Sequence, residues 1–344
     1  MSAVIDTQSE RGAWSLNDVS DQWLDEIERR LTASCERCAG ASLLLRDMTA
    51  FHLATGGKRL RALIPVWVCG NLGGDAAAAV SVGVGLELLH NATLVHDDLQ
   101  DGDQTRRGQQ TVWRRWGAAQ AINAGDALYF QGLAEILTAP GGARCAALAS
   151  DALIRVIEGQ AMEFQLQLPR DNQDAIAPTV EAWMHMAGGK TAALFAACMA
   201  SGGVCAGADD ATIEALGLMG EQIGLLFQVQ DDYLDIVGDK GRERRATDLA
   251  EGKLSFPVTW ALTHGGAQQV ARLAEIIATP RADTTDAMID EGSRILEESG
   301  ALAATSRWLR ETAQRIEASE LARVVPGLVE RILAPVATAL AAEP

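Results

Sequence analysis

The chain has 344 residues, of which 48% are hydrophobic and 22% are charged, a globular composition that excludes extended disorder. Its 29 Lys and Arg residues stand against 46 Asp and Glu residues, which gives a formal net charge of -17. This balance excludes binding of nucleic acid through a basic surface. Asp6 stands where a secretory signal needs a basic region, and the most apolar run, residues 76–95, contains Glu87, so we expect a cytoplasmic protein without stable membrane insertion.

Apolar residues recur at three- and four-residue intervals from Leu16 to Leu340, whereas alternating β-branched runs are nearly absent. This pattern predicts an all-α fold with long helices. We expect residues 1–15 to form a mobile tail and residues 16–344 to form a single large helical bundle, with Ile213–Val229 in its centre. The predicted helices are separated, in chain order, by breaks at 56–57, 73–74, 101–102, 140–142, 169–178, 202–203, 238–245, 265–266 and Pro280.

Two acidic clusters of identical spacing end strongly apolar helical stretches. Residues four apart share a helix face, so in each cluster the first and last carboxylates are aligned. Acids are unfavourable at the negative end of a helix dipole, and the repetition argues against simple capping. Sparse carboxylate oxygens suit Mg²⁺, which completes its shell with water and phosphates. The clusters are Asp97, Asp98 and Asp101, and Asp231, Asp232 and Asp235.

Positive charge is concentrated at three glycine-containing sites. Glycine-flanked cations at helix starts are typical of phosphate sites, although a single basic pair is more often a surface ion pair. Three such sites together with two acidic clusters indicate two diphosphates held side by side. The third site is not a Walker A loop, because Met184 stands where that loop needs its first glycine. The cations are Lys58 and Arg61, Arg106 and Arg107, and Lys190 of Gly189-Lys190-Thr191.

Seven ordered segments resemble the trans-isoprenyl diphosphate synthases, also called the polyprenyl synthetase family. The resemblance implies an isoprenoid synthase bundle with a central active-site cavity, a homodimer, and two substrates, isopentenyl diphosphate and an allylic diphosphate. A longer trans-polyprenyl diphosphate and pyrophosphate would be the products. The matching segments are Gly56–Arg61, His90–Asp101, Arg106–Gly108, Ala121–Asp126, Gly189–Thr191, Phe227–Asp235 and Asp248–Lys253.

The resemblance also implies residue roles. Asp97, Asp98, Asp101, Asp231 and Asp235 would bind about three Mg²⁺ ions when substrate is bound, with Asp232 nearby. Arg106, Lys190, Thr191, Gln228 and Lys253 would hold the allylic diphosphate, and Lys58, Arg61, His90 and Arg107 the isopentenyl diphosphate. Mg²⁺ and the cations would stabilise a departing pyrophosphate, the isopentenyl double bond would attack the allylic cation, and the pyrophosphate would take the proton.

Departures from the family pattern leave some positions open. A lysine common before the last motif has no clean match, and Lys240, Arg242 and Arg244 are the alternatives. Gln110 replaces a common proline, and this could loosen the turn after Arg107. A terpene cyclase of the same fold is an alternative function, but it would not need an isopentenyl site. A non-catalytic partner subunit is another, but such subunits usually lose one acidic cluster.

Helical geometry bears on product length, because the growing chain must run away from the diphosphates along the helix that precedes Asp97. Ala92 and Thr93 lie five and four residues before this aspartate and are small, where short-chain relatives often place an aromatic ring. Leu89, Tyr129 and Phe130 are candidates for the side chains that close the bottom of the chain-binding pocket further from the diphosphates. We therefore expect a product of C20 or longer.

Overall fold

The computed structural model describes residues 13–37, 43–167, 172–238 and 246–342, and these residues are almost entirely helical. Among these residues there are two short strands, β1 (Thr105–Arg106) and β2 (Gln109–Gln110), which pair antiparallel. Four helices have more than 20 residues, as the periodicity predicted, and the all-α prediction is confirmed. These helices are α1 (Leu16–Glu36), α4 (Ala76–Gln100), α7 (Gly142–Gln167) and α10 (Asp210–Val237).

The chain divides into two compact units, and α7 and α10 contribute residues to both. The first unit contains Met1–Asp151, Leu194–Gly220 and Arg323–Pro326, and the second contains Ala152–Ala193, Glu221–Ala322 and Gly327–Pro344. A single domain over residues 16–344 therefore stays a prediction. The predicted tail falls largely on residues 1–12, which lie outside the described residues.

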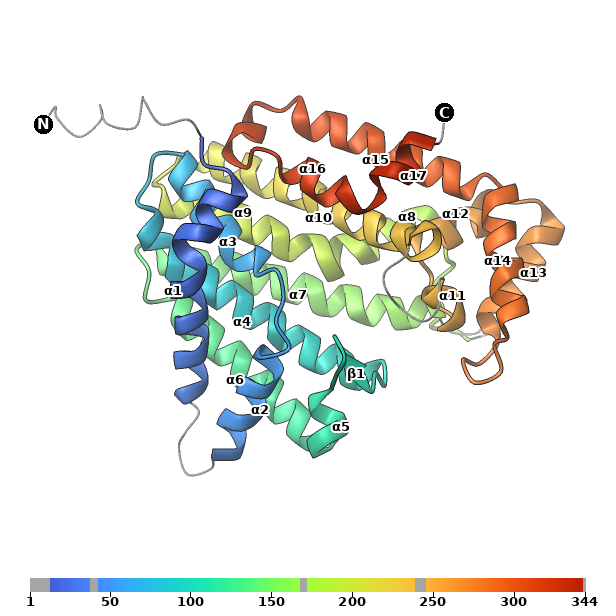
Figure 1. Cartoon of the computed structure of the whole chain (residues 1–344), viewed down its shortest axis with the longest axis horizontal. Helices are drawn as coiled ribbons and strands as arrows, with labels where there is room; N and C mark the ends of the chain where they lie inside the picture. Colours follow the sequence, from blue (N-terminus) through green and yellow to red (C-terminus); the bar gives the residue numbers. More distant parts are fainter. Residues whose placement is uncertain (1–12, 38–42, 168–171, 239–245, 343–344) are drawn as a thin grey trace, which may run out of the picture. The chain divides into compact units, whose positions relative to one another are not determined.

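The first unit is built around α4, which packs against α3 (Leu60–Asn71) and α6 (Ala118–Ile136) (Figure 1). Glycines permit the close approach of α4 to α6, because a Cβ atom at Gly85 would lie 2.6 Å from the carbonyl oxygen of Gly132. Helix α4 is long and apolar enough to cross a membrane, but 78% of its most apolar window is buried inside the protein, which is typical of a core helix. The unit also contains α2 (Leu43–Leu53) and α5 (Val112–Trp116). All of α9 (Ala193–Cys205) except its first residue belongs to this unit.

The second unit has its own apolar core, which includes Leu249, Val258, Leu273 and Leu296. Aromatic rings extend this core, since Phe256 packs against Trp183 at 5.2 Å and Trp308 at 5.7 Å between ring centroids. The helices of this unit are α8 (Val180–Ala187), the π-helical turn η1 (Gly188–Ala192), α11 (Thr247–Ala250), α12 (Phe256–His264), α13 (Ala267–Ala278), α14 (Asp286–Glu298), α15 (Ala301–Glu317), α16 (Leu328–Leu333), η3 (Ala334–Val336) and α17 (Ala337–Ala342), and the 3-10 turn η2 (Glu320–Val324) includes residues of both units.

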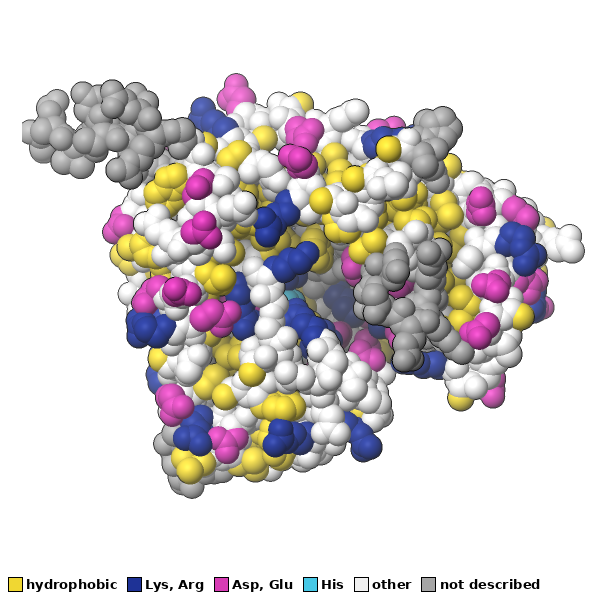
Figure 2. Space-filling view, viewed as in Figure 1, with side chains coloured by type: hydrophobic (Ala, Val, Ile, Leu, Met, Phe, Trp, Pro, Cys, Tyr) yellow, Lys and Arg dark blue, Asp and Glu magenta, His cyan; other side chains and the backbone are white. Residues whose placement is uncertain are grey.

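Charged side chains of both signs are interspersed on the face of the protein that Figure 2 shows. Acidic side chains are scattered there among apolar and neutral ones, so the excess of acids is not gathered into one acidic region of this face.

Candidate active site

The first acidic cluster occupies the last turn of α4. The amide of Asp101 donates to the carbonyl oxygen of Asp97 at 2.8 Å, which places the two residues one helical turn apart as predicted. The side chain of Asp97 is 22% exposed, whereas Asp98 is buried. Arg106 Nε donates to Asp98 Oδ1 at 2.7 Å, and Asp98 Oδ2 is buried without a hydrogen-bond partner among the described residues. Burial raises the pKa of Asp98 to about 6 despite the charge of Arg106.

A two-residue turn directs the adjacent arginines to different partners. Arg107 and Gly108 have φ values of 52° and 79°, the conformation of a type I′ hairpin turn between β1 and β2. Arg106, in β1, reaches the acidic cluster, whereas Arg107 Nη1 donates to the carbonyl oxygen of Gly56. Gln110, which stands in place of the family proline, pairs with Thr105, so the hairpin forms with this residue.

The residues predicted to bind isopentenyl diphosphate lie together in the first unit. Lys58 is exposed in the loop before α3. Arg61 Nη1 donates to His90 Nε2 at 3.1 Å, and its guanidinium lies 4.8 Å from the centroid of the Phe195 ring. Gly57 has a φ of 145°, a conformation that residues with side chains rarely adopt, so the backbone favours glycine where Arg107 reaches this loop.

Burial lowers the pKa of Arg61 and Arg107, and it also lowers the pKa of His90 well below its ordinary value, with Arg61 adding to the effect on the histidine. The set therefore combines a neutral imidazole with closely spaced guanidinium groups. Such an arrangement favours an anion, because a bound anion relieves the repulsion between the cations.

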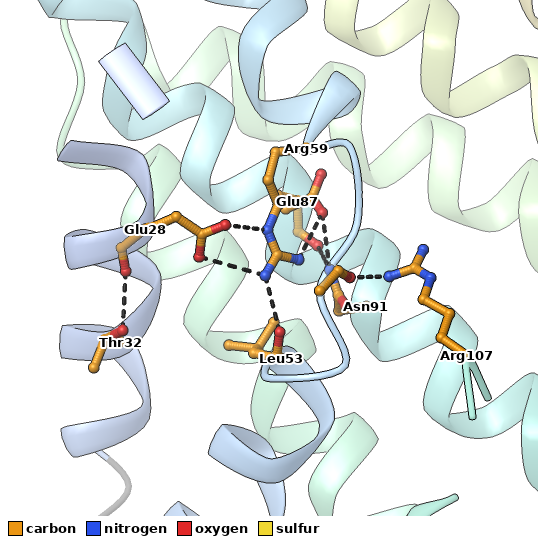
Figure 3. Close-up of polar contacts among 8 residues, drawn as sticks. Glu28, Thr32, Leu53, Arg59, Glu87, Asn91 and Arg107 are labelled. Atoms are coloured by element: carbon orange, nitrogen blue, oxygen red, sulfur yellow. Dashed lines mark hydrogen bonds and ion pairs between the residues drawn. The ribbon is translucent and has the colours of Figure 1, made fainter. Parts of the chain in front are cut away.

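A buried network behind this loop was missed by the sequence reasoning. Arg59, between Lys58 and Arg61, turns inward to Glu28 and Glu87 (Figure 3). Asn91 Nδ2 donates to Glu87 Oε1 at 3.2 Å, and His52 is buried in α2. One signal was available: Glu87 is a charge inside an apolar helix, and a buried charge needs a partner.

The predicted allylic-diphosphate residues of the second unit gather at a π-helical turn. Lys190 and Thr191 lie in η1, and π-helical turns are frequent at functional sites. Lys190 Nζ forms an ion pair with Glu163 of α7, and Thr191 Oγ1 donates to Gln228 Oε1 at 2.7 Å. A Cβ atom at Gly189 would lie 2.5 Å from the carbonyl oxygen of Arg155, so this turn packs directly on the backbone of α7.

The second acidic cluster shares the spacing of the first but not its exposure. Asp231 is exposed, whereas Asp232 and Asp235 are buried. Asp232 accepts hydrogen bonds from the Phe256 amide at 2.7 Å and from Gln228 Nε2 at 2.9 Å, and burial raises its pKa well above the usual range. In this geometry Asp232 anchors the start of α12 rather than pointing to solvent.

Asp235 has a comparable anchoring geometry. Its carboxylate accepts from Thr247 Oγ1 at 2.6 Å and from the Asp248 amide at 3.0 Å. Lys253 follows this turn, and its Nζ lies 3.2 Å from Glu251 Oε2. The alternatives for the family lysine, Lys240, Arg242 and Arg244, lie outside the described residues.

The residues predicted to control chain length all belong to the first unit. Leu89 and Ala92 are fully buried in α4, and Thr93 is partly exposed. The Tyr129 ring lies 5.6 Å from that of His96, between centroids. Phe130 is 73% exposed, so within this chain its ring does not project into the interior of the first unit. The role of these residues in setting chain length stays a prediction.

Comparison with known proteins assigns the family. The model of the polyprenyl synthetase family matches residues 43–291. The chain belongs to the polyprenyl synthetase family. It is 36% identical over 260 residues to a geranylgeranyl diphosphate synthase of Mycobacterium tuberculosis, covering 70% of this chain and 71% of that one. It is 31% identical over 290 residues to a short chain isoprenyl diphosphate synthase of Methanothermobacter thermautotrophicus, covering 83% and 85%.

A solved structure agrees with this assignment. The polyprenyl synthetase of Streptomyces coelicolor superimposes with a TM-score of 0.79 at 29% sequence identity, covering 95% of this chain and 99% of that one. The predicted family, the isoprenoid synthase fold and the prenyltransferase class are therefore confirmed. The sequence prediction of a chain-elongating enzyme is favoured over a terpene cyclase or a non-catalytic subunit.

Proposed function

We propose that this enzyme condenses isopentenyl diphosphate with an allylic diphosphate to a longer trans-polyprenyl diphosphate and releases pyrophosphate. The observation that carries the proposal is the grouping of Lys58, Arg61, His90 and Arg107 in the first unit. These cations and the neutral imidazole suit the diphosphate of isopentenyl diphosphate. Curated relatives named as geranylgeranyl and short chain isoprenyl diphosphate synthases support the same reaction.

For the allylic substrate, we assign binding of the diphosphate to Lys190, Thr191, Gln228 and Lys253 of the second unit, and to Arg106 on the family resemblance. Lys190 is held by Glu163, and Thr191 by Gln228, so both side chains are oriented before substrate arrives. Cations that face the departing diphosphate stabilise the charge that develops as the allylic C–O bond breaks. The isopentenyl double bond then attacks the allylic cation, and a proton passes to the released pyrophosphate.

The proposed cofactor is Mg²⁺, which would add to the stabilisation of the departing diphosphate. The described residues contain no group of three or more His, Cys, Asp or Glu side chains placed to hold a metal by themselves. Separate acids fit an ion that takes most of its ligands from water and phosphate oxygens, and Asp98 Oδ2 is a buried oxygen without a hydrogen-bond partner among these residues. Asp97, Asp98, Asp101, Asp231 and Asp235 would hold the ions, with Asp232 nearby, and Asp232 and Asp235 also accept hydrogen bonds from neighbouring groups.

We propose a product of C20 or longer. The small side chains of Ala92 and Thr93 leave no ring one turn before Asp97, and Phe130 is turned outward. The first obstacle within the first unit is then Leu89 or Tyr129. The name of the Mycobacterium relative, a geranylgeranyl diphosphate synthase, agrees with this length.

We propose a homodimer, because α6 and α7 each carry a line of exposed apolar side chains. Ile122 and Phe130 lie on α6 and Leu137 is its C-cap residue, with spacings of eight and seven residues, and Ile154, Ile157 and Phe164 are similarly exposed on α7. A second copy would remove these side chains from water. We also propose a cytoplasmic location without stable membrane insertion, since the apolar helix α4 is largely buried.

The reaction is tested by incubating the protein with Mg²⁺, labelled isopentenyl diphosphate and allylic diphosphates of graded length. Label in a longer diphosphate supports the proposal, and its chain length measures the product. A cyclic hydrocarbon formed from the allylic diphosphate alone would instead identify a cyclase. No turnover with any primer would identify a non-catalytic subunit.

A further inference from the structure

Arg59 lies between two predicted substrate ligands but differs from both in its direction. Lys58 is exposed, whereas Arg59 is 4% exposed and points inward (Figure 3). Its Nε donates to Glu28 Oε1 at 2.7 Å, its Nη1 to Glu87 Oε1 at 3.3 Å, and its Nη2 to the carbonyl oxygen of Leu53 at 2.9 Å. One guanidinium therefore joins α1, the end of α2 and α4 at the point where α3 begins.

The backbone at Arg59 agrees with this inward direction. Its φ and ψ values of 47° and 31° lie in the left-handed region, which is unfavourable for a residue with a side chain. Such a conformation persists where surrounding contacts fix it, and here those contacts are made by the guanidinium. Because Arg59 is the N-cap of α3, the same contacts determine where Arg61 stands in the first helical turn.

The charges show that Arg59 is not itself a ligand for an anion. Burial alone would lower the pKa of Arg59, but its hydrogen bonds with Glu28 and the charge of Glu87 raise it overall. Burial lowers the pKa of Arg61 and Arg107 without a comparable compensation. A diphosphate is therefore attracted to the guanidinium groups of Arg61 and Arg107. The guanidinium of Arg59 is already engaged by carboxylates.

We propose that Arg59, held by Glu28 and Glu87, is a positioning residue that fixes Lys58 and Arg61 for binding of isopentenyl diphosphate. The inference rests on the proposed function. It assigns Glu87 a role opposite to that expected from its charge, because a carboxylate beside an anion site should weaken anion binding. Positioning predicts weaker binding when Glu87 is neutralised, whereas charge alone predicts tighter binding.

The test measures kcat and both KM values for Glu87→Gln and Arg59→Lys, with Tm determined for each protein. We expect KM for isopentenyl diphosphate to rise roughly 10- to 100-fold, the cost of misplacing binding groups through a supporting residue. kcat and KM for the allylic diphosphate should stay within about twofold of wild type. Glu28→Gln should give a smaller rise in KM for isopentenyl diphosphate, because the Glu28 side chain is 46% exposed. This variant tests the proposal if the proteins with buried substitutions do not fold.

Glu135→Gln is the matched control. Glu135 is as buried as Glu87 and forms ion pairs with Arg30 at 2.7 Å and Arg37 at 3.0 Å in the same unit. Among the hydrogen bonds and ion pairs of the described residues, none joins Glu135 to the Gly56–Arg61 segment. It should lower Tm without changing KM for isopentenyl diphosphate. An unchanged or lower KM in Glu87→Gln, or an equal rise in Glu135→Gln, would overturn the positioning role. Failure of wild type to incorporate the label would overturn the proposed function instead.

Discussion

Replacing His52 with glutamine should make folding less sensitive to acid. His52 is 2% exposed in α2, and burial, with the charges of Arg106 and Arg107, lowers its pKa to about 3. In the unfolded chain an ordinary histidine has a pKa of about 6.5. The unfolded state therefore takes up a proton as the pH falls through 6.5, while the folded state stays neutral. The stability associated with His52 is fully present above pH 6.5 and is lost as the pH falls toward 3.

The size of this effect follows from the pKa of the unfolded chain. Between pH 7 and pH 5, protonation of one ordinary histidine in the unfolded state lowers the free energy of unfolding by about 2 kcal/mol, because the folded state does not titrate in this range. For a chain of this length that free energy corresponds to a fall in Tm on the order of 3 °C. The glutamine side chain of the His52→Gln variant would keep a polar group beside Asn91 but cannot take up the proton.

The assay is urea unfolding, followed by circular dichroism, at pH 7 and at pH 5. The difference in unfolding free energy between the two pH values should be about 2 kcal/mol smaller in His52→Gln than in wild type. His185→Gln, at an exposed position of α8, is the control and should keep the wild-type difference. His90, whose pKa is also lowered, is present in all three proteins and cancels in the comparison. An unchanged difference in His52→Gln would refute the reasoning.

Three further predictions concern activity. Asp97→Ala and Asp231→Ala should each lower kcat by roughly 10²- to 10³-fold, and EDTA should abolish turnover, whereas near wild-type rates in either case would contradict metal dependence. Lys58→Ala should raise mainly KM for isopentenyl diphosphate and Lys190→Ala mainly KM for the allylic diphosphate, and equal effects on both constants would contradict the assignment. Ala92→Phe should shorten the product to C15, and because Ala92 is fully buried, a lower Tm should accompany the change; an active variant with an unchanged product would refute the proposed role of this position in chain length.

The sequence predicted those features that depend on local pattern. Apolar periodicity indicated long helices, and four helices above 20 residues are present. The spacing of Asp97 and Asp101 indicated one helical turn, which the 2.8 Å hydrogen bond between their backbones confirms. Family resemblance brought Arg61 and His90 to the same candidate site, and their side chains are in contact.

Other features could not be predicted, because they depend on neighbours distant in sequence. Nothing near Arg59 in the chain indicates that its side chain turns inward, since the carboxylates that engage it are 31 residues before and 28 residues after it. The π-helical conformation at Lys190 likewise depends on α7, whose backbone approaches Gly189 so closely that no Cβ atom fits. Propensity describes a residue and its immediate neighbours, whereas these features arise from packing between helices.

The two acidic clusters show how far spacing alone can define a role. In each cluster the middle aspartate is buried, but Asp98 is held by the guanidinium of Arg106, whereas Asp232 accepts hydrogen bonds from the Phe256 amide and Gln228. The guanidinium of Arg106 balances the charge of Asp98 and leaves its Oδ2 without a hydrogen-bond partner among the described residues, whereas neutral backbone and amide donors engage both oxygens of Asp232. Identical spacing therefore places the same residue type in two different surroundings. The partner that the fold supplies decides whether a carboxylate oxygen is left available to a metal ion or is already engaged.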